Sequence, residues 1–186
     1  MRNLLKSKNV TNLKILAVSA LFAAISFICG KFLAISIGET IRFSFENLPL
    51  MLVGFMFGPT VGAITAVTAD IVGCLLRGYA INPILTFASA FIGFFSGLVF
   101  NALIRSKLSV RITAAVAFCH FFGSILLKTI GLSVWLGYPF FVTLLSRSLN
   151  YVIVFAAELP ILILILKNKQ FMGEISKLTG EKNELR

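Results

Sequence analysis

Residues 84–104 read ILTFASAFIGFFSGLVFNALI, an apolar run without a single charged side chain. A helix rises about 1.5 Å per residue, so a run of this length can cross the roughly 30 Å hydrocarbon core of a bilayer. The rest of the chain has the same character: of 186 residues, 58% are hydrophobic and 13% charged, with a mean hydropathy of +0.97. No polar stretch is long enough to build a soluble core. We therefore predict one all-α integral membrane domain over residues 1–186.

Five further apolar segments lie on either side of this run. We predict six transmembrane helices at about residues 13–35, 47–57, 60–77, 84–104, 111–135 and 140–166. The second segment is short for a bilayer, so we expect it to be tilted, interrupted or shielded by its neighbours. Gly58-Pro59 and Asn82-Pro83 mark the turns before the third and fourth helices.

Basic residues give the orientation. Twelve of the 17 lie in the two tails and in the connection between the fourth and fifth segments: Arg2, Lys6, Lys8, Lys14, Arg105, Lys107, Arg111, Lys167, Lys169, Lys177, Lys182 and Arg186. The positive-inside rule assigns these regions to the cytoplasm. We expect a multi-pass plasma-membrane protein with both termini cytoplasmic. Because the net charge of +10 comes mainly from these short flanking clusters, it does not indicate nucleic-acid binding.

The five remaining cations are predicted to lie toward the outer side of the membrane: Lys31, Arg42, Arg77, Lys128 and Arg147. Charged groups inside a membrane usually line a pathway or a binding site, because leaving them in hydrocarbon is costly. Several positive charges near one opening suggest an anionic ligand taken from outside. For Lys31 and Arg77, snorkelling to the outer headgroups is an equal alternative.

The predicted first outer connection, residues 36–46, has the period of a strand. Ile41, Phe43 and Phe45 alternate with polar or charged residues, which favours a short strand or hairpin that covers the outer mouth. Aromatic residues here and at Trp135 suit interfacial anchoring and suit stacking on a flat heteroaromatic ring. The sequence alone does not decide between the two.

Two further sets share a helix face in the outer halves of the last two segments. Lys128 and Trp135 are seven residues apart, and Arg147 is three residues from Asn150. An arginine binds carboxylates through a bidentate fork, and an asparagine offers both a donor and an acceptor to an amide or pterin edge. Both sets are expected to lie opposite the outer connection that carries Arg42 and the aromatic residues.

Several kinds of chemistry find no support in the sequence. It has no nucleotide-binding loop, no catalytic-triad spacing and no metal-ligand pattern, and its three cysteines stand singly inside apolar segments. Only two acids, Asp70 and Glu158, lie deep in the predicted helices, and an ion pair between Asp70 and Arg77 is one possibility. We expect no enzymatic activity, no cofactor and no bound metal.

Ala20 and Ala24 in the first segment form a small-residue face at which helices can approach closely.

Several motifs together resemble a known family. They are Ala20-Leu21-Phe22-Ala23-Ala24, Ile41-Arg42-Phe43-Ser44-Phe45 with Leu48-Pro49, Phe57-Gly58-Pro59, Ile81-Asn82-Pro83-Ile84-Leu85-Thr86, Leu127-Lys128-Thr129 with Trp135, and Arg147 with Asn150. Over residues 13–168 the chain resembles the substrate-capture (S) components of energy-coupling factor (ECF) vitamin transporters, most closely the folate family.

The resemblance implies a six-helix subunit that binds folate near the outer face and releases it inward. Its implied partners are a membrane coupling protein, contacted through Ala20 and Ala24, and two cytoplasmic ATPases that hydrolyse ATP. The implied substrate-binding residues are Arg42, Phe43, Phe45, Lys128, Trp135, Arg147 and Asn150. Two alternatives stay open: an S component for riboflavin, pantothenate or a pyridoxine-like compound, and a membrane structural protein whose inner charges are paired.

Overall fold

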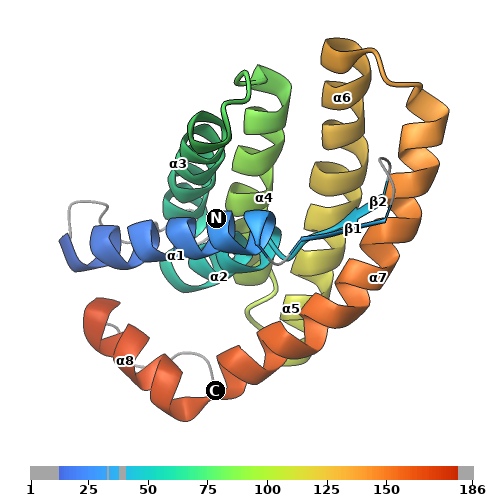
Figure 1. Cartoon of the computed structure of the whole chain (residues 1–186). Coiled ribbons are helices and arrows are strands. Elements are labelled where there is room, and N and C mark those ends of the chain that lie inside the picture. The colour runs from blue at the N-terminus through green and yellow to red at the C-terminus, as the bar shows by residue number, and fades with distance from the viewer. Residues whose placement is uncertain (1–12, 33, 38–40, 180–186) are drawn as a thin grey trace.

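The computed structural model describes residues 13–32, 34–37 and 41–179, and helices dominate these ranges. They are α1 (Leu13–Lys31), α2 (Asn47–Phe57), α3 (Pro59–Arg77), α4 (Pro83–Ala102), α5 (Leu108–Phe118), the π-helix η1 (Cys119–Leu127), α6 (Lys128–Leu136), α7 (Phe140–Lys167) and α8 (Lys169–Thr179) (Figure 1). The predicted all-α class is confirmed. The predicted basic residues Arg2, Lys6, Lys8, Lys182 and Arg186 lie outside the described residues.

Five helical stretches are long and apolar enough to cross a membrane: α1, α3, α4, the continuous run from α5 to α6, and α7. The sixth predicted segment is α2, which has 11 residues. The first prediction extended too far, since α1 ends at Lys31 and the chain enters β1 (Ile35–Ile37) four residues later. The six-segment prediction thus agrees with the structure, with shifted boundaries.

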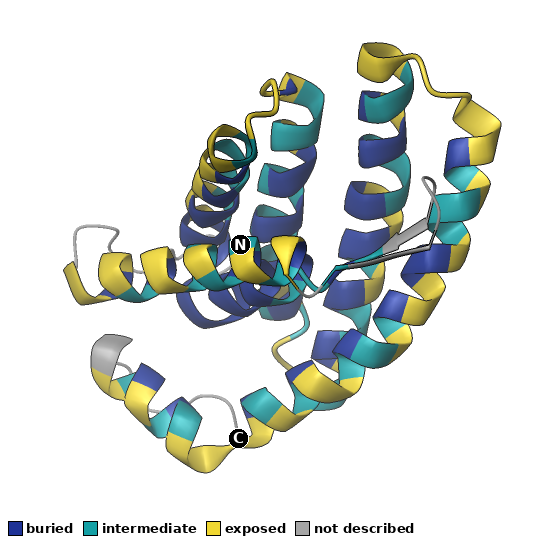
Figure 2. Ribbon diagram, in the orientation of Figure 1, coloured by how far each residue is buried: buried dark blue, intermediate teal, exposed yellow. Residues whose placement is uncertain are grey.

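The short helix α2 is enclosed by its neighbours. It packs against α1, α3 and α4, and Met51, Val53 and Phe57 are fully buried. Figure 2 shows this part of the chain in dark blue, whereas the outer faces of α1 and α7 are largely exposed. Of the three expectations for this segment, shielding by other helices is therefore the one the structure supports. A helix that contacts protein on all sides need not match the thickness of the bilayer.

Glycines let α2, α3 and α4 approach one another closely. A Cβ atom at Gly93 on α4 would collide with the carbonyl group of Gly62 on α3, and the reverse holds as well. Likewise, a Cβ atom at Gly97 would lie 2.6 Å from the carbonyl oxygen of Gly54 on α2. Small residues at such contacts allow backbones to pack closely in membranes, where packing rather than water exclusion drives association. These glycines therefore make contacts between helices inside the bundle.

The alternating segment forms the expected hairpin. Strand β1 pairs antiparallel with β2 (Ile41–Phe43), with Ile35 opposite Phe43 and Ile37 opposite Ile41. Strand β2 packs against α7, and Figure 1 shows the hairpin reaching from the end of α1 toward the middle of α7. The hairpin therefore lies beside the helix that carries Arg147 and Asn150.

The C-terminal segment was predicted only as a basic tail, but residues 169–179 form the amphipathic helix α8. Met172 and Ile175 are buried and belong to the same apolar core as Ile15 and Leu166. Their spacing of three places both on one helical face. Helix α8 therefore packs under α1 and α7, and its charged residues face outward.

Arg111 was predicted to lie in the loop between the fourth and fifth segments, but it lies inside α5 and is 4% exposed. Its Nε donates a hydrogen bond to the carbonyl oxygen of Phe100 at 3.0 Å. Its guanidinium carbon lies 3.9 Å from the centre of the Phe100 ring. Arg111 thus stabilises the end of α4, where carbonyl groups lack partners within the helix.

Replacing Arg111 by methionine is expected to lower the stability of the folded protein by about 2 kcal/mol, because a charge-assisted hydrogen bond and a cation–π contact are both lost. Thermal unfolding in detergent measures the effect. Lys107→Met removes an exposed positive charge nearby and serves as the control. Equal melting temperatures for the two variants would contradict the role assigned to Arg111.

Candidate ligand-binding site

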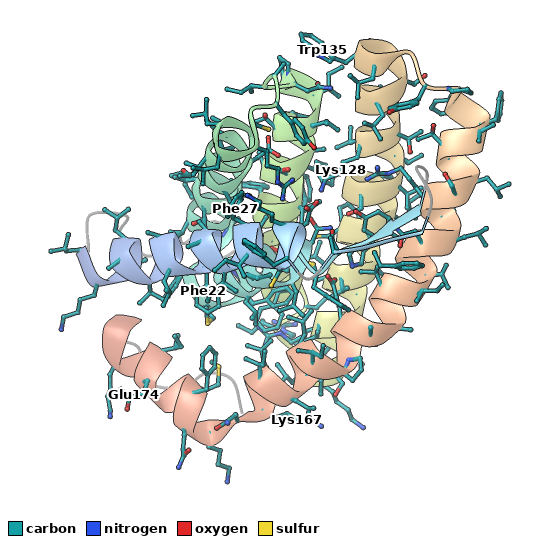
Figure 3. The ribbon with its side chains drawn as sticks, in the orientation of Figure 1. Phe22, Phe27, Lys128, Trp135, Lys167 and Glu174 are labelled. Carbon is teal, nitrogen blue, oxygen red and sulfur yellow. The ribbon has the colours of Figure 1, made fainter. Side chains whose placement is uncertain are left out.

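Lys128 is the centre of a buried polar cluster. Its Nζ lies 3.1 Å from Glu46 Oε1 and 3.4 Å from Asn47 Oδ1. The Lys128 side chain is 10% exposed and that of Glu46 is 27% exposed. A buried ammonium group is costly without a counter-charge. Glu46, directly before α2, provides this negative charge for Lys128 at the start of α6. Figure 3 shows Lys128 within the bundle.

The cluster continues from Asn47 into η1 and α7. Asn47 Nδ2 donates to Ser124 Oγ at 3.1 Å. The backbone carbonyl oxygen of Ser124 accepts a hydrogen bond from Arg147 Nε, also at 3.1 Å. The guanidinium carbon of Arg147 lies 5.5 Å from the centre of the Tyr151 ring. Two residues, Asn47 and Ser124, therefore connect the two cations Lys128 and Arg147.

The π-helix η1 carries part of this arrangement. In a π-helix, backbone hydrogen bonds join residues five apart, so each turn holds more residues than an α-helical turn. His120 and Ser124 lie in η1 and Lys128 directly follows it, and the three form one row: His120 Nδ1 is 3.4 Å from Ser124 Oγ, and Asn47 contacts both Ser124 and Lys128. Irregular segments of this kind are frequent at functional sites.

The row ends at a fully buried acid. His120 Nε2 lies 2.8 Å from Glu158 Oε2, and their side chains are 4% and 0% exposed. Tyr151 stacks obliquely on the His120 ring at 5.1 Å between centres. The pair is therefore screened from solvent and holds η1 against α7.

The two other cations predicted to lie toward the outer side are both found near the end of α1. Lys31 is exposed and lies over the Phe27 ring. Arg77 is half-buried, and its guanidinium carbon lies 5.5 Å from the centre of the same Phe27 ring. Asp70 accepts a hydrogen bond from Thr86 Oγ1 at 2.6 Å. Within the described ranges no ion pair joins Asp70 to Arg77, so the suggested pairing is wrong: hydroxyl groups of α4 hold this carboxylate instead.

The structure brings together most, though not all, of the predicted binding residues. Lys128, Arg147 and the buried Asn150 lie near the hairpin, and Phe43 and Phe45 at its end are half-buried. Arg42 lies in β2 opposite Ser36, but its side chain is outside the described part. Trp135 is 52% exposed at the far end of α6, well away from Lys128 (Figure 3). The role of each residue in binding stays a prediction.

Sequence reasoning missed Glu46, Asn47 and Ser124 as members of the site. Two signals were available: Glu46-Asn47 directly follows the alternating segment, and Ser124 stands four residues before Lys128. Neither is decisive, because a spacing of four within one helix does not show which residue of another element these side chains contact. Among the residues the structure describes, no group of three or more His, Cys, Asp or Glu side chains is arranged to hold a metal ion.

Comparison with known proteins identifies the family. Residues 14–167 match the family described as "ECF transporter, substrate-specific component". This chain belongs to that family. The protein is thus an S component, the substrate-specific part of a membrane transporter.

Solved structures support the fold of this S component. It is similar to FolT in the crystal structure of FolT bound with folic acid, with a TM-score of 0.65 at 20% identity over 92% of this chain and 94% of that chain. It is also similar to the S component of a bacterial ECF transporter, with a TM-score of 0.61 at 20% identity over 87% of this chain and 98% of the other. At such low identity the likeness shows a shared fold.

A curated relative is more similar in sequence over a shorter region. The protein from Mycoplasma pneumoniae (strain ATCC 29342 / M129 / Subtype 1) described as "Uncharacterized protein MG313 homolog" is 34% identical over 92 residues, or 50% of this S component and 32% of that protein. The matched region therefore spans about a third of the relative's length.

Proposed function

We propose that this S component captures folate at the outer face of the plasma membrane and delivers it inward in an ATP-driven ECF importer. The S component itself catalyses no reaction and holds neither cofactor nor metal. A coupling protein and two cytoplasmic ATPases supply the energy, and both termini of the S component lie in the cytoplasm. Family membership supports the transport role, and the likeness to FolT in fold is consistent with a folate ligand.

One observation carries the assignment of an anionic ligand. Arg147 is half-buried and is held in place through Nε and the Tyr151 ring, yet in the described part of the chain no carboxylate lies within ion-pairing distance of it. A half-buried guanidinium without a counter-ion is unusual in a membrane protein. Its two terminal NH₂ groups have the geometry to bind a carboxylate in a bidentate manner.

Folate matches the remaining groups as well. It carries two carboxylates and a flat pterin ring. Lys128 provides a second cation, Phe43 and Phe45 provide aromatic surfaces near the hairpin, and Asn150 provides an amide for the pterin edge. Arg42 and Trp135 complete the proposed binding residues at the hairpin and at the outer end of α6.

Calorimetric titration of the detergent-purified protein with folate tests this function. Riboflavin, pantothenate and thiamin serve as comparison ligands. We expect folate alone to bind tightly, at about one molecule per chain. Tight binding of a comparison vitamin instead would retain the transport role and change the substrate. If folate does not bind, the proposed substrate is wrong.

The exposed small-residue face of α1 is the proposed docking site for the coupling protein. Ala20 and Ala24 are both exposed, so large side chains fit there without disturbing the bundle. Co-expressed with its partners, the variant Ala20→Trp/Ala24→Trp is expected to recover less than about a tenth of the wild-type amount of coupling protein, because bulky rings prevent close helix approach. Folate binding should stay unchanged.

The matched control is Ala156→Trp, which places the same side chain on an exposed position of α7. Co-purification of the four-protein complex on an affinity tag gives the measurement. Normal recovery of the coupling protein with the doubly substituted α1 would place the docking face elsewhere.

A further inference from the structure

Glu46 makes separate contacts through its backbone and through its side chain. Its carbonyl oxygen accepts a hydrogen bond from Ser26 Oγ on α1 at 2.6 Å. Its carboxylate reaches Lys128 on α6 at 3.1 Å. Rotation of the side chain can therefore move the carboxylate away from Lys128 while the start of α2 stays in place.

The surroundings of Glu46 provide room for such a movement. Its side chain is 27% exposed, nearly three times the value of 10% for Lys128. A Cβ atom at Gly30 would lie 2.8 Å from Glu46 Oε2 and 2.9 Å from Arg77 Nη2, so both side chains lie over Gly30, and Glu46 Oε2 faces the side of Arg77 while Oε1 contacts Lys128. Arg77, half-buried over the Phe27 ring, lies on the side to which the carboxylate can turn.

We propose that Glu46 is a resident counter-ion that the carboxylate of an incoming ligand displaces from Lys128, and that Glu46 thereby selects for anionic ligands. Without ligand, Glu46 offsets the cost of burying the ammonium group. A ligand carboxylate offsets the same cost, so the exchange keeps the site neutral around Lys128. An uncharged ligand cannot replace Glu46 without leaving Lys128 unpaired. This inference rests on the proposed function, which supplies the anionic ligand.

The exchange predicts the unusual result that removing a site residue tightens binding. In Glu46→Gln the competing charge is absent, and folate affinity is expected to rise about tenfold, the value of one charge-assisted hydrogen bond at 1.4 kcal/mol per factor of ten. Pteroate, with one carboxylate, tests whether that single group suffices. Binding of 6-hydroxymethylpterin, which has none, is expected to change less than about twofold.

Calorimetric titration of these three compounds against wild-type and Glu46→Gln protein gives the comparison. Glu174→Gln is the control, because it removes an exposed negative charge that pairs with Lys177 on α8. If Glu46 instead accepts hydrogen bonds from the pterin ring, Glu46→Gln weakens all three compounds alike, and the exchange is refuted. Unchanged folate affinity refutes it too.

Two additions keep the test decisive. If Glu46→Gln does not fold, Glu46→Asp keeps the charge and draws the carboxylate back from Lys128. Its folate affinity should lie between those of wild type and a tenfold gain, and weaker binding than wild type refutes the exchange. If wild-type protein binds no pterin, the proposed folate function fails by itself. Pantothenate and its neutral alcohol pantothenol then replace the pterins, and a gain confined to pantothenate supports the exchange, whereas no gain refutes it.

Discussion

Replacing Arg147 by methionine is expected to weaken folate binding by about a hundredfold or more while the protein remains folded. A bidentate arginine–carboxylate contact comprises two charge-assisted hydrogen bonds and contributes about 3 kcal/mol, which corresponds to that factor. In the unliganded protein the substitution removes only the hydrogen bond to the Ser124 carbonyl oxygen and the contact with Tyr151. No described ion pair is broken, so stability should change little.

Lys107→Met, which removes a distant exposed cation, controls for the change in net charge. Arg147→Lys keeps the charge but not the planar fork, and should recover only part of the affinity. Calorimetry measures binding, and thermal unfolding measures stability. The alternative of a membrane structural protein predicts the reverse pattern: Arg147→Met would lower expression and melting temperature. A folded variant that binds folate like wild type would remove Arg147 from the site.

Replacing Gly93 by alanine is expected to have the largest effect on stability, at about 3 kcal/mol or more, which is the upper range for overpacking. The added methyl group would overlap the Gly62 carbonyl group and lie 2.9 Å from Ala66 Cβ. The groups that it meets on α3 include backbone atoms, which cannot move aside as a flexible side chain does. Helices α3 and α4 would have to separate along their contact.

Gly173→Ala is the matched control for this substitution. A Cβ atom at Gly173 has no heavy atom within 4 Å, and the residue lies in the middle of α8. Alanine there should stabilise the helix by about 0.5–1 kcal/mol. Melting temperatures of the two variants in the same detergent should therefore move in opposite directions. A melting temperature of Gly93→Ala close to that of wild type would show that α3 and α4 can shift apart at little cost.

Hydropathy and turn residues were enough to predict most of the fold. Each apolar run of sufficient length became a helix, and Gly58 and Asn82 stand at the predicted turns. The end of α1 was not predictable from hydropathy, because residues 32–35 are as apolar as the helix before them. Helix α8 was not predicted, because its lysines resemble a basic tail. Its few apolar side chains become buried only against the neighbouring helices.

The site was predictable in its charges but not in its connections. Lys128 and Arg147 stood out because both interrupt apolar surroundings. Asn47 and Ser124 link these two cations. The contacts of Asn47 with Ser124 and with Lys128 span 77 and 81 positions of the sequence, and no local pattern specifies contacts at such separations. The counter-ion Glu46 was visible only as one member of an alternating segment. The buried pair of His120 and Glu158 likewise joins residues that are 38 positions apart.

The wide turns of η1 also affect how this chain is aligned with its relatives. Over residues 119–127 the backbone accommodates more residues per turn than an α-helix does. A relative whose fifth span is α-helical throughout would need fewer residues to bring a side chain to the position of Lys128. An alignment drawn without a gap in this region would then equate residues that point in different directions, by about 100° for each position of offset. Ligand preferences transferred along such an alignment would be assigned to the wrong side chains from Lys128 onward.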